Sequence, residues 1–315
     1  MTRAFIFPGQ GSQAVGMGRT LADAFASARE VFEEVDDALE QKLSGLMWQG
    51  PEDELVLTEN AQPAIMAASL AIIAILRREG GFALARHARL VAGHSLGEYS
   101  ALCAAGAFTL SDTARLLKAR GRAMQSAVPV GEGGMSALLG AEIEQAEALA
   151  RECAAATGGV CVVANDNAPG QVVISGSKAA IDRAPEVAKA KGIKRAMALN
   201  VSAPFHCPLM QPAADKMREA LASVTIRPLA VPVVSNVTAA QTTEPETIRR
   251  LLVEQITGRV RWRESVQAFR EHGVETTVEV GGAKVLTGMV KRIDKDLQTV
   301  TLDTPADVEA FMKTL

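Results

Sequence analysis

The sequence predicts an α/β fold in which a large unit with a parallel β-sheet carries a smaller inserted unit. The chain has 315 residues, which is enough for about two domains. Short apolar runs alternate with longer amphipathic stretches almost throughout, as is typical of α/β proteins. In the middle of the chain the order becomes strand-helix-strand-strand-helix-strand, which is the ferredoxin-like pattern.

The first part of the chain supplies the beginning of the large unit. Residues 4–7 are apolar and end at Pro8, which predicts a short strand followed by a glycine-rich turn. The nearly apolar run 64–76 predicts a buried helix that begins after Asn60, with Pro63 in its first turn, since a membrane span needs about 20 residues. We then expect a strand at 90–92, a helix at 96–105, and a helix that Ser111 caps and that ends near Ala127.

Residues 128–199 are expected to form the small ferredoxin-like domain, and residues 1–127 with 200–315 the large α/β domain. A glycine-rich stretch after Pro129 and the segment 201–208 bound the small domain. Its expected strands are 135–140, 160–164, 171–175 and 194–199, and its expected helices are 142–156 and 178–191. In the remainder of the large domain we expect helices at 209–223, 246–256, 263–272 and 305–314, and strands at 231–235 and 277–280.

Composition and charge argue against several classes of protein. An aromatic share of 4% is thin for stacking on bases, and a net charge of −3 provides no field that attracts nucleic acid or anionic membranes. The four cysteines form no CxxC pair and are too few for a disulfide framework. The N-terminal apolar run is too short for a signal peptide. We therefore expect a cytoplasmic protein with reduced thiols, and neither nucleic acid nor a membrane as a partner.

The sharpest local signal is Gly93-His94-Ser95-Leu96-Gly97, a GxSxG pentapeptide between a predicted strand and a predicted helix. Glycines on either side of the serine allow the tight turn of a nucleophile elbow, which suggests an α/β-hydrolase-like large domain. The helix that starts at Leu96 would direct its N-terminal N–H groups at the group that Ser95 attacks. The alternative is a purely structural glycine-rich turn.

A nucleophilic serine needs a base, and the chain has four histidines. His206 follows a predicted strand in a proline-stiffened loop, a common place for catalytic residues. His94 is expected to support the turn, His87 to be solvated, and His272 to lie at a helix C-terminus. The absence of an HExxH motif and of a Cys/His cluster argues against a catalytic zinc.

An arginine occupies an unusual position on the helix predicted to end near Ala127. Leu116, Arg120 and Met124 share one face of this helix, which is otherwise apolar. An unpaired buried guanidinium is costly, so Arg120 needs an anion. A structural salt bridge, a side chain that extends to water, and a bidentate clamp on a substrate carboxylate all remain open.

Together these residues resemble the malonyl-CoA:acyl carrier protein transacylases of fatty acid synthesis and the related acyltransferase domains of polyketide synthases. The resemblance covers almost the whole chain. Its markers are Phe7-Pro8-Gly9-Gln10-Gly11-Ser12-Gln13, Gly93-His94-Ser95-Leu96-Gly97-Glu98, Gln62-Pro63, Arg120, Gln171-Val172-Val173-Ile174-Ser175-Gly176 and Phe205-His206. The run 279–284 departs from the family's usual sequence, which leaves the geometry of that turn open.

The resemblance implies that Ser95 is the acylated nucleophile and His206 its general base and later general acid. Backbone N–H groups of Gln10 and Leu96 would form the oxyanion hole, and Arg120 would bind the malonyl carboxylate.

The resemblance also implies supporting positions. Gln255 matches the position whose backbone carbonyl orients the histidine in this family, and Gln62 and Asn165 match positions that line the pocket. Phe205 offers bulk where an α-methyl branch would sit, which favours malonyl over methylmalonyl groups.

The implied substrates are malonyl-CoA and an acyl carrier protein with a phosphopantetheine arm, with no further cofactor and no metal. We expect a monomer. An acidic carrier would dock on a local basic patch, for which the sequence offers two candidates: Lys284, Lys291 and Arg292, or Lys189, Lys191, Lys194 and Arg195.

Three other functions remain open at this point. A serine hydrolase or thioesterase of the α/β-hydrolase type predicts an HGGG-like oxyanion loop, which the sequence lacks. A polyketide-type acyltransferase would use a different extender unit. A non-catalytic carrier-binding protein would have no need for Ser95, His206 and Arg120 together.

Overall fold

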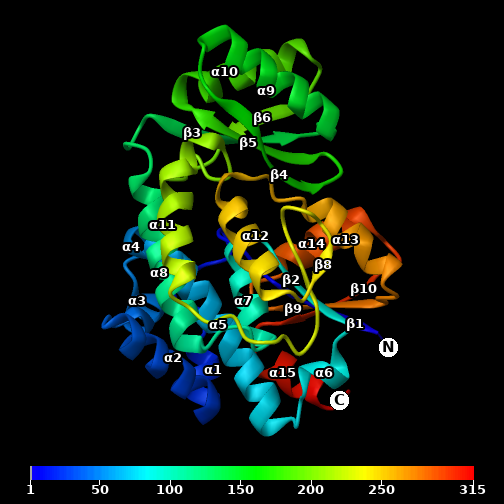
Figure 1. Cartoon of the computed structure of the whole chain (residues 1–315). Helices are drawn as coiled ribbons and strands as arrows, with labels where there is room; N and C mark the ends of the chain where they lie inside the picture. The colour runs from blue at the N-terminus through cyan, green and yellow to red at the C-terminus, as the bar shows by residue number, and fades with distance from the viewer. Residues whose placement is uncertain (1) are drawn as a thin grey trace.

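The computed structural model describes residues 2–315 and contains two β-sheets, each with its own helices (Figure 1). The larger sheet has six strands in the order β10-β9-β1-β2-β7-β8. All neighbouring pairs are parallel except β7 and β8, which are antiparallel. The strands are β1 (Arg3–Phe7), β2 (Leu90–Gly93), β7 (Val233–Val234), β8 (Gln241–Thr242), β9 (Thr276–Val280) and β10 (Gln298–Leu302).

The central strand β1 explains why helices cover both faces of this sheet. Side chains alternate across a strand, so consecutive apolar residues face opposite sides. Phe5 and Phe7 belong to one apolar core, whereas Ala4 and Ile6 belong to another that contains Trp262. All four are completely buried, which is expected of a strand between two helical layers.

The helices of the large unit come from both ends of the chain. The longest, α5, is apolar enough to cross a membrane by composition, but 89% of its most apolar window is buried in the protein, so it is a core helix. The set is α1 (Arg19–Ala24), α2 (Ala26–Leu39), α3 (Leu43–Gln49), α4 (Glu52–Leu55), α5 (Thr58–Glu79), α6 (Leu84–His87), α7 (Leu96–Ala104), α8 (Leu110–Ser126), α11 (Gln211–Ala222), α12 (Pro245–Thr257), α13 (Trp262–Glu271), α14 (Val285–Ile293) and α15 (Pro305–Met312).

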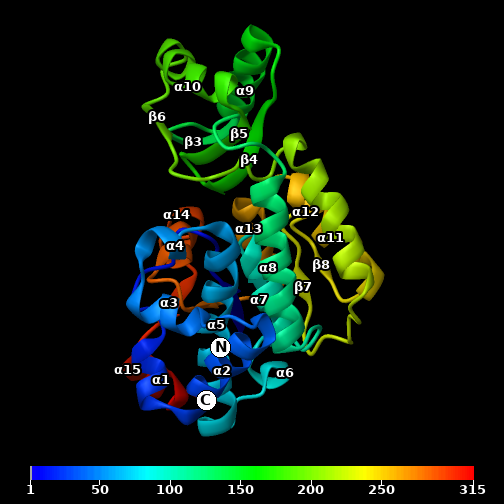
Figure 2. The ribbon, with the colours of Figure 1, turned by 90° about the vertical axis from the view of Figure 1, so that its left-hand side faces the viewer.

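The smaller sheet stands at one end of the molecule, coloured green in both views (Figures 1 and 2). Its elements follow the predicted order: β3 (Gly133–Leu139), α9 (Ile143–Thr157), β4 (Cys161–Ala168), β5 (Gln171–Ser177), α10 (Lys178–Ala190) and β6 (Arg195–Ala198). The strands are antiparallel in the order β4-β5-β3-β6. This unit has an apolar core of its own, formed between the sheet and the two helices.

Backbone pairing joins the two units. The N–H of Val260 donates to Ala164 O at 2.8 Å, and the N–H of Asp166 donates to Val260 O at 2.9 Å. Arg263 also contacts the buried Asp166 carboxylate at 3.0 Å. These bonds hold the end of β4 against the large unit, so side chains from both units can line one cavity.

Several sequence predictions of element boundaries were wrong. The helix predicted to begin after Asn60 begins at Thr58, so Pro63 lies inside it rather than in its first turn. The polar residue Asn60 concealed this start, because it is buried and accepts a hydrogen bond of 2.8 Å from Lys118 Nζ of α8. Thr109, not Ser111, caps α8, since its hydroxyl accepts from the N–H of Asp112 at 3.0 Å.

Other elements were shortened or missed. The strand predicted at 231–235 is reduced to Val233–Val234. Helices α1 to α4, α6 and α14 and strands β8 and β10 had no counterpart among the predicted elements. In the run 279–284, four consecutive residues from Gly281 to Lys284 have positive φ, which defines the turn that the sequence left open.

Candidate active site

Ser95 lies in the turn that joins β2 to α7, with φ 53° and ψ −111°. An L-residue reaches this conformation only at a cost of about 1–3 kcal/mol. The two glycines of the pentapeptide permit this turn because, without a side chain, they let neighbouring backbone segments approach closely. A Cβ on Gly93 would lie 1.9 Å from the carbonyl carbon of Gly97, and a Cβ on Gly97 would lie 2.2 Å from Phe7 O. Any side chain at position 93 or 97 would therefore overlap the neighbouring backbone, so the turn requires glycine on both sides of Ser95.

Asn236 holds this turn from the neighbouring strand. Its Oδ1 accepts a hydrogen bond of 2.7 Å from the N–H of Ser95, and its Nδ2 donates to Gly93 O at 2.6 Å. Asn236 follows β7, which pairs with β2, and its side chain is completely buried. The amide thus satisfies two backbone groups that the strained turn would otherwise leave without partners.

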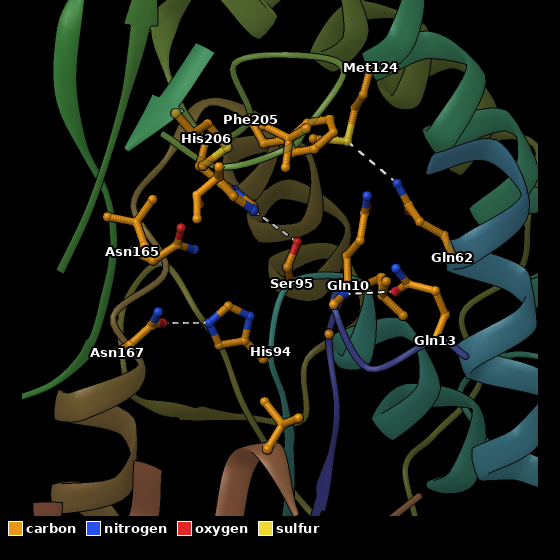
Figure 3. Close-up of a pocket in the computed structure, with 18 of the residues that line it drawn as sticks. Gln10, Gln13, Gln62, His94, Ser95, Met124, Asn165, Asn167, Phe205 and His206 are labelled. Carbon is orange, nitrogen blue, oxygen red and sulfur yellow. Dashed lines mark hydrogen bonds between the residues drawn. The ribbon is translucent and has the colours of Figure 1, made fainter. Parts of the chain in front are cut away.

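His206 stands against the serine hydroxyl (Figure 3). Its Nε2 lies 2.8 Å from Ser95 Oγ, and its Nδ1 lies 2.8 Å from the carbonyl oxygen of Gln255. A carbonyl oxygen only accepts, so Nδ1 carries the proton and Nε2 is free to accept one from the serine. Burial, and next the charge of Arg120, lower the pKa of His206 to about 3, which keeps the imidazole neutral.

The guanidinium of Arg120 contacts the serine hydroxyl, and the residue is 1% exposed. Its Nη1 donates to Gln62 Oε1 at 2.7 Å, and its Nη2 donates to Gln255 Oε1 at 2.8 Å and to Ser95 Oγ at 3.0 Å. The guanidinium also lies 5.6 Å from the ring centre of Tyr99. Within residues 2–315 it forms no salt bridge and does not reach solvent. Its polar partners are neutral oxygens, so a charged anion would be a stronger partner than any of them.

Gln255 contacts Ser95, His206 and Arg120 at once. Its Nε2 donates to Glu98 Oε2 at 2.7 Å and to Ser95 O at 3.0 Å, while its Oε1 and backbone oxygen serve Arg120 and His206. Glu98 Oε2 also accepts from the N–H of Asn236 at 3.1 Å. Burial raises the pKa of Glu98 to about 7 despite these hydrogen bonds and the nearby Arg120.

Two residues that line the same cavity as Ser95 carry backbone N–H groups without an acceptor in the described part of the chain. Leu96 is the first residue of α7, and Gln10 follows β1; both residues line the cavity. Within residues 2–315 neither N–H donates to a protein acceptor. Unpaired donors at a helix N-terminus and in an adjacent loop are suited to stabilise a negatively charged oxygen.

The cavity has a volume of about 360 Å³ and draws residues from both units. Asn165 of β4 lines it from the small unit, and Phe205 and Met124 line the part beside His206 (Figure 3). Val285 of α14 lines the cavity and is 37% exposed. The volume is within the range of small-molecule sites. The residues named from the sequence, Ser95, His206, Gln10, Leu96, Arg120, Gln255, Gln62, Asn165 and Phe205, are thus gathered in one place.

The other histidines have structural contacts. His94 Nε2 lies 2.8 Å from Asn167 Oδ1 of β4, away from the serine hydroxyl (Figure 3), and its support of the turn stays a prediction. His272 lies at the C-cap of α13, as expected. The expectation that His87 is solvated was wrong, because the ring is half-buried, bonds to Ala83 O at 2.9 Å and stacks on a phenylalanine.

Sequence reasoning gave no role to Asn236 or Glu98. One signal could have identified Asn236: the carboxyl ends of neighbouring parallel strands meet at one edge of a sheet, and Asn236 and Ser95 follow adjacent strands. Glu98 was noted only as part of a motif. Its contact with Gln255 spans 157 positions of the chain, and no local pattern indicates such a contact.

Comparisons with known proteins agree with this geometry. The family model described as "Acyl transferase domain" matches residues 4–305. The malonyl CoA-acyl carrier protein transacylase of Escherichia coli K12 is 45% identical, with 98% of each chain covered, and that of Bacillus subtilis is 44% identical, with 99% of this chain and 96% of the relative covered.

Solved structures match equally well. The acyl-carrier-protein-S-malonyltransferase of Bartonella henselae has a TM-score of 0.96 at 52% identity and covers 100% of this chain and 99% of its own. A malonyl-transacylase solved in complex with a type II PKS acyl-carrier protein has a TM-score of 0.95 at 42% identity, with both chains fully covered. The chain described here therefore belongs to the acyl transferase family, among the malonyl CoA-acyl carrier protein transacylases.

Proposed function

We propose that this chain transfers a malonyl group from malonyl-CoA to the pantetheine thiol of an acyl carrier protein, through a malonyl ester on Ser95. The observation that carries the proposal is the 2.8 Å contact between Ser95 Oγ and His206 Nε2. The names of the relatives supply the donor and the acceptor. The proposed reaction needs no resident metal or cofactor, because the nucleophile and the base are both side chains.

In the first half-reaction, Ser95 Oγ forms a bond to the thioester carbonyl carbon while its proton passes to His206 Nε2. The C–S bond then breaks, and the imidazolium returns the proton to the CoA thiolate. In the second half-reaction the carrier thiol gives its proton to His206, its sulfur attacks the ester, and Ser95 Oγ leaves with that proton. The neutral imidazole, whose pKa is about 3, is in the state needed to accept a proton.

The backbone N–H groups of Gln10 and Leu96 are proposed to hold the oxyanion in both half-reactions. Both residues line the cavity that Ser95 enters, and neither N–H has a protein acceptor within residues 2–315. Loss of one such donor typically costs about 3 kcal/mol of transition-state stabilisation.

Arg120 is proposed to select dicarboxylic acyl groups. Its Nη2 lies 3.0 Å from Ser95 Oγ, so a carboxylate one methylene beyond the attacked carbonyl would meet the guanidinium. An acetyl group would leave the guanidinium with neutral acceptors. Phe205 is proposed to exclude an α-methyl branch, since its buried ring lines the cavity immediately beside His206.

Of the two basic clusters, we favour Lys284, Lys291 and Arg292 as the docking patch for an acidic carrier. Lys284 directly precedes Val285, which lines the cavity, whereas Lys191 of the other cluster pairs with Glu152 at 2.7 Å. We also propose that the protein acts as a monomer in the cytoplasm. Its catalytic side chains come from one chain, and its four cysteines are buried and unpaired.

A transfer assay tests the function against its rivals. Malonyl-CoA is mixed with the enzyme, with or without holo acyl carrier protein, and malonyl-carrier and free malonate are both measured. The proposal expects malonyl-carrier as the main product and little malonate in either mixture. Malonate as the main product in the presence of carrier would indicate a hydrolase. Equal rates with methylmalonyl-CoA would contradict the role given to Phe205.

A further inference from the structure

We propose that Thr58 is a positioning residue: its hydroxyl connects Arg120, through Gln62, to Gln10, and thereby fixes the Gln10 backbone N–H relative to the carboxylate-binding arginine. The inference rests on the proposed function, because it concerns the oxyanion donor of that reaction. Thr58 is the first residue of α5, is completely buried, and does not line the cavity.

Four side chains form an unbroken chain of hydrogen bonds beside the cavity. Arg120 Nη1 lies 2.7 Å from Gln62 Oε1, Gln62 Nε2 lies 2.8 Å from Thr58 Oγ1, and Thr58 Oγ1 lies 2.9 Å from Gln10 Oε1. Gln10 and Gln62 lie on the same side of Ser95, opposite His206 (Figure 3). The chain therefore runs from the guanidinium to the loop that carries one oxyanion donor.

The chemistry of Arg120 fixes the direction of every link. A guanidinium has donors only, so Gln62 must turn its oxygen toward Arg120 and its NH₂ group toward Thr58. Thr58 Oγ1 therefore accepts from Gln62, and its own proton is left for Gln10 Oε1. Bonds that all donate in one direction polarise one another, so the loss of one link weakens the rest.

Helix packing fixes the place of Thr58 as well as its hydrogen bonds. A Cβ on Gly121, the residue after Arg120, would lie 2.7 Å from Thr58 O. The start of α5 and this turn of α8 are thus in direct backbone contact. The backbone of Thr58 is thus packed against the residue that follows Arg120, and its hydroxyl bonds to the side chain of Gln10.

The test replaces Thr58 without changing its shape. Thr58→Val keeps the volume and removes the hydroxyl, while Thr58→Ser keeps the hydroxyl. We expect Thr58→Val to lower kcat for malonyl transfer about tenfold, part of the 10²- to 10³-fold typical of a lost oxyanion donor. KM for malonyl-CoA should change less than about threefold, because the bond from Arg120 to Gln62 Oε1 is weakened but not lost and the bond from Arg120 to Gln255 is unaffected. Thr58→Ser should restore kcat, which a packing role for the methyl group would not explain.

Thr113→Val is the matched control. Thr113 is also completely buried near the start of a helix, and its hydroxyl donates to Thr109 O at 2.7 Å, outside the chain described above. It should leave kcat and KM at wild-type values. If Thr58→Val fails to fold, Thr58→Ala is compared with Thr58→Ser: both lack the γ-methyl group, and only Thr58→Ser keeps the hydroxyl, so kcat should be about tenfold lower in Thr58→Ala.

The outcomes separate this inference from the proposed function. If the wild-type enzyme transfers malonyl groups and Thr58→Val has an unchanged kcat, the inference alone is overturned. A rise in KM with kcat intact also overturns it, because that result assigns Thr58 to binding. No malonyl transfer by the wild-type enzyme overturns the proposed function, and the inference with it.

Discussion

Replacing Arg120 by alanine removes the group proposed to distinguish malonyl-CoA from acetyl-CoA. In the free enzyme the guanidinium contacts Gln62, Gln255 and Ser95, all through neutral oxygens. Its Nη1 and Nη2 atoms can therefore turn to a substrate carboxylate without breaking an ion pair. A buried, charge-assisted pair of this kind costs about 2–5 kcal/mol when one partner is removed.

At about 1.4 kcal/mol per factor of ten, this range corresponds to a loss of roughly 30- to 4,000-fold in kcat/KM for malonyl-CoA. The value for acetyl-CoA should stay the same or rise, because acetyl has no carboxylate to lose. The assay is transfer to holo carrier protein from each donor, with kcat and KM determined separately.

Arg122→Ala is the control for the Arg120 variant. Arg122 lies on the same helix, is exposed, and pairs with Glu59 at 2.9 Å, so it should behave as the wild type. A malonyl loss of less than about threefold in Arg120→Ala, or a parallel loss with acetyl-CoA, would refute the reasoning.

Three further expectations follow from the site. Asn236→Ala should lower kcat about tenfold with KM nearly unchanged, because it frees the strained turn of Ser95; an unchanged acylation rate in stopped-flow would contradict this. Phe205→Ala should raise the methylmalonyl-CoA to malonyl-CoA ratio of kcat/KM in competition assays, and an unchanged ratio would contradict the role of its ring. Between pH 6.5 and 4.5, the lowered pKa of His206, about 3, makes acidification destabilising, whereas the raised pKa of Glu98, about 7, makes it stabilising. Denaturant titrations at pH 7 and pH 5 give the free energy of unfolding of each variant relative to wild type. On moving to pH 5 this difference should rise for His206→Gln and fall for Glu98→Gln, by up to about 1.4 kcal/mol per pH unit. Changes of the same sign in both variants would contradict the assignment.

Features of the fold that depend on local chemistry were accessible from the sequence. The short apolar run 4–7 ending at Pro8 predicted β1, and the GxSxG pentapeptide predicted a tight turn between strand and helix. The structure explains why these residue types are needed: a side chain on Gly93 or Gly97 would overlap the backbone. The assignment of the large unit to a hydrolase-like fold and of the small unit to a ferredoxin-like fold stays a prediction.

Features that depend on contacts between distant segments were not accessible from the sequence. Asn236 bonds to Ser95 across 141 positions, and Thr58 bonds to Gln10 across 48. An isolated polar residue in such a place looks like part of a loop. The same effect hid the start of α5, where Asn60 is polar because it bonds to Lys118 of α8 rather than to solvent.

The most direct test of the central claim is intact-mass spectrometry of the enzyme mixed with malonyl-CoA. The account expects a single malonyl adduct on the wild-type protein, none on Ser95→Ala, and loss of the adduct when holo acyl carrier protein is added. An adduct that persists in Ser95→Ala, or one that the carrier does not discharge, would contradict a seryl ester as the intermediate of the transfer.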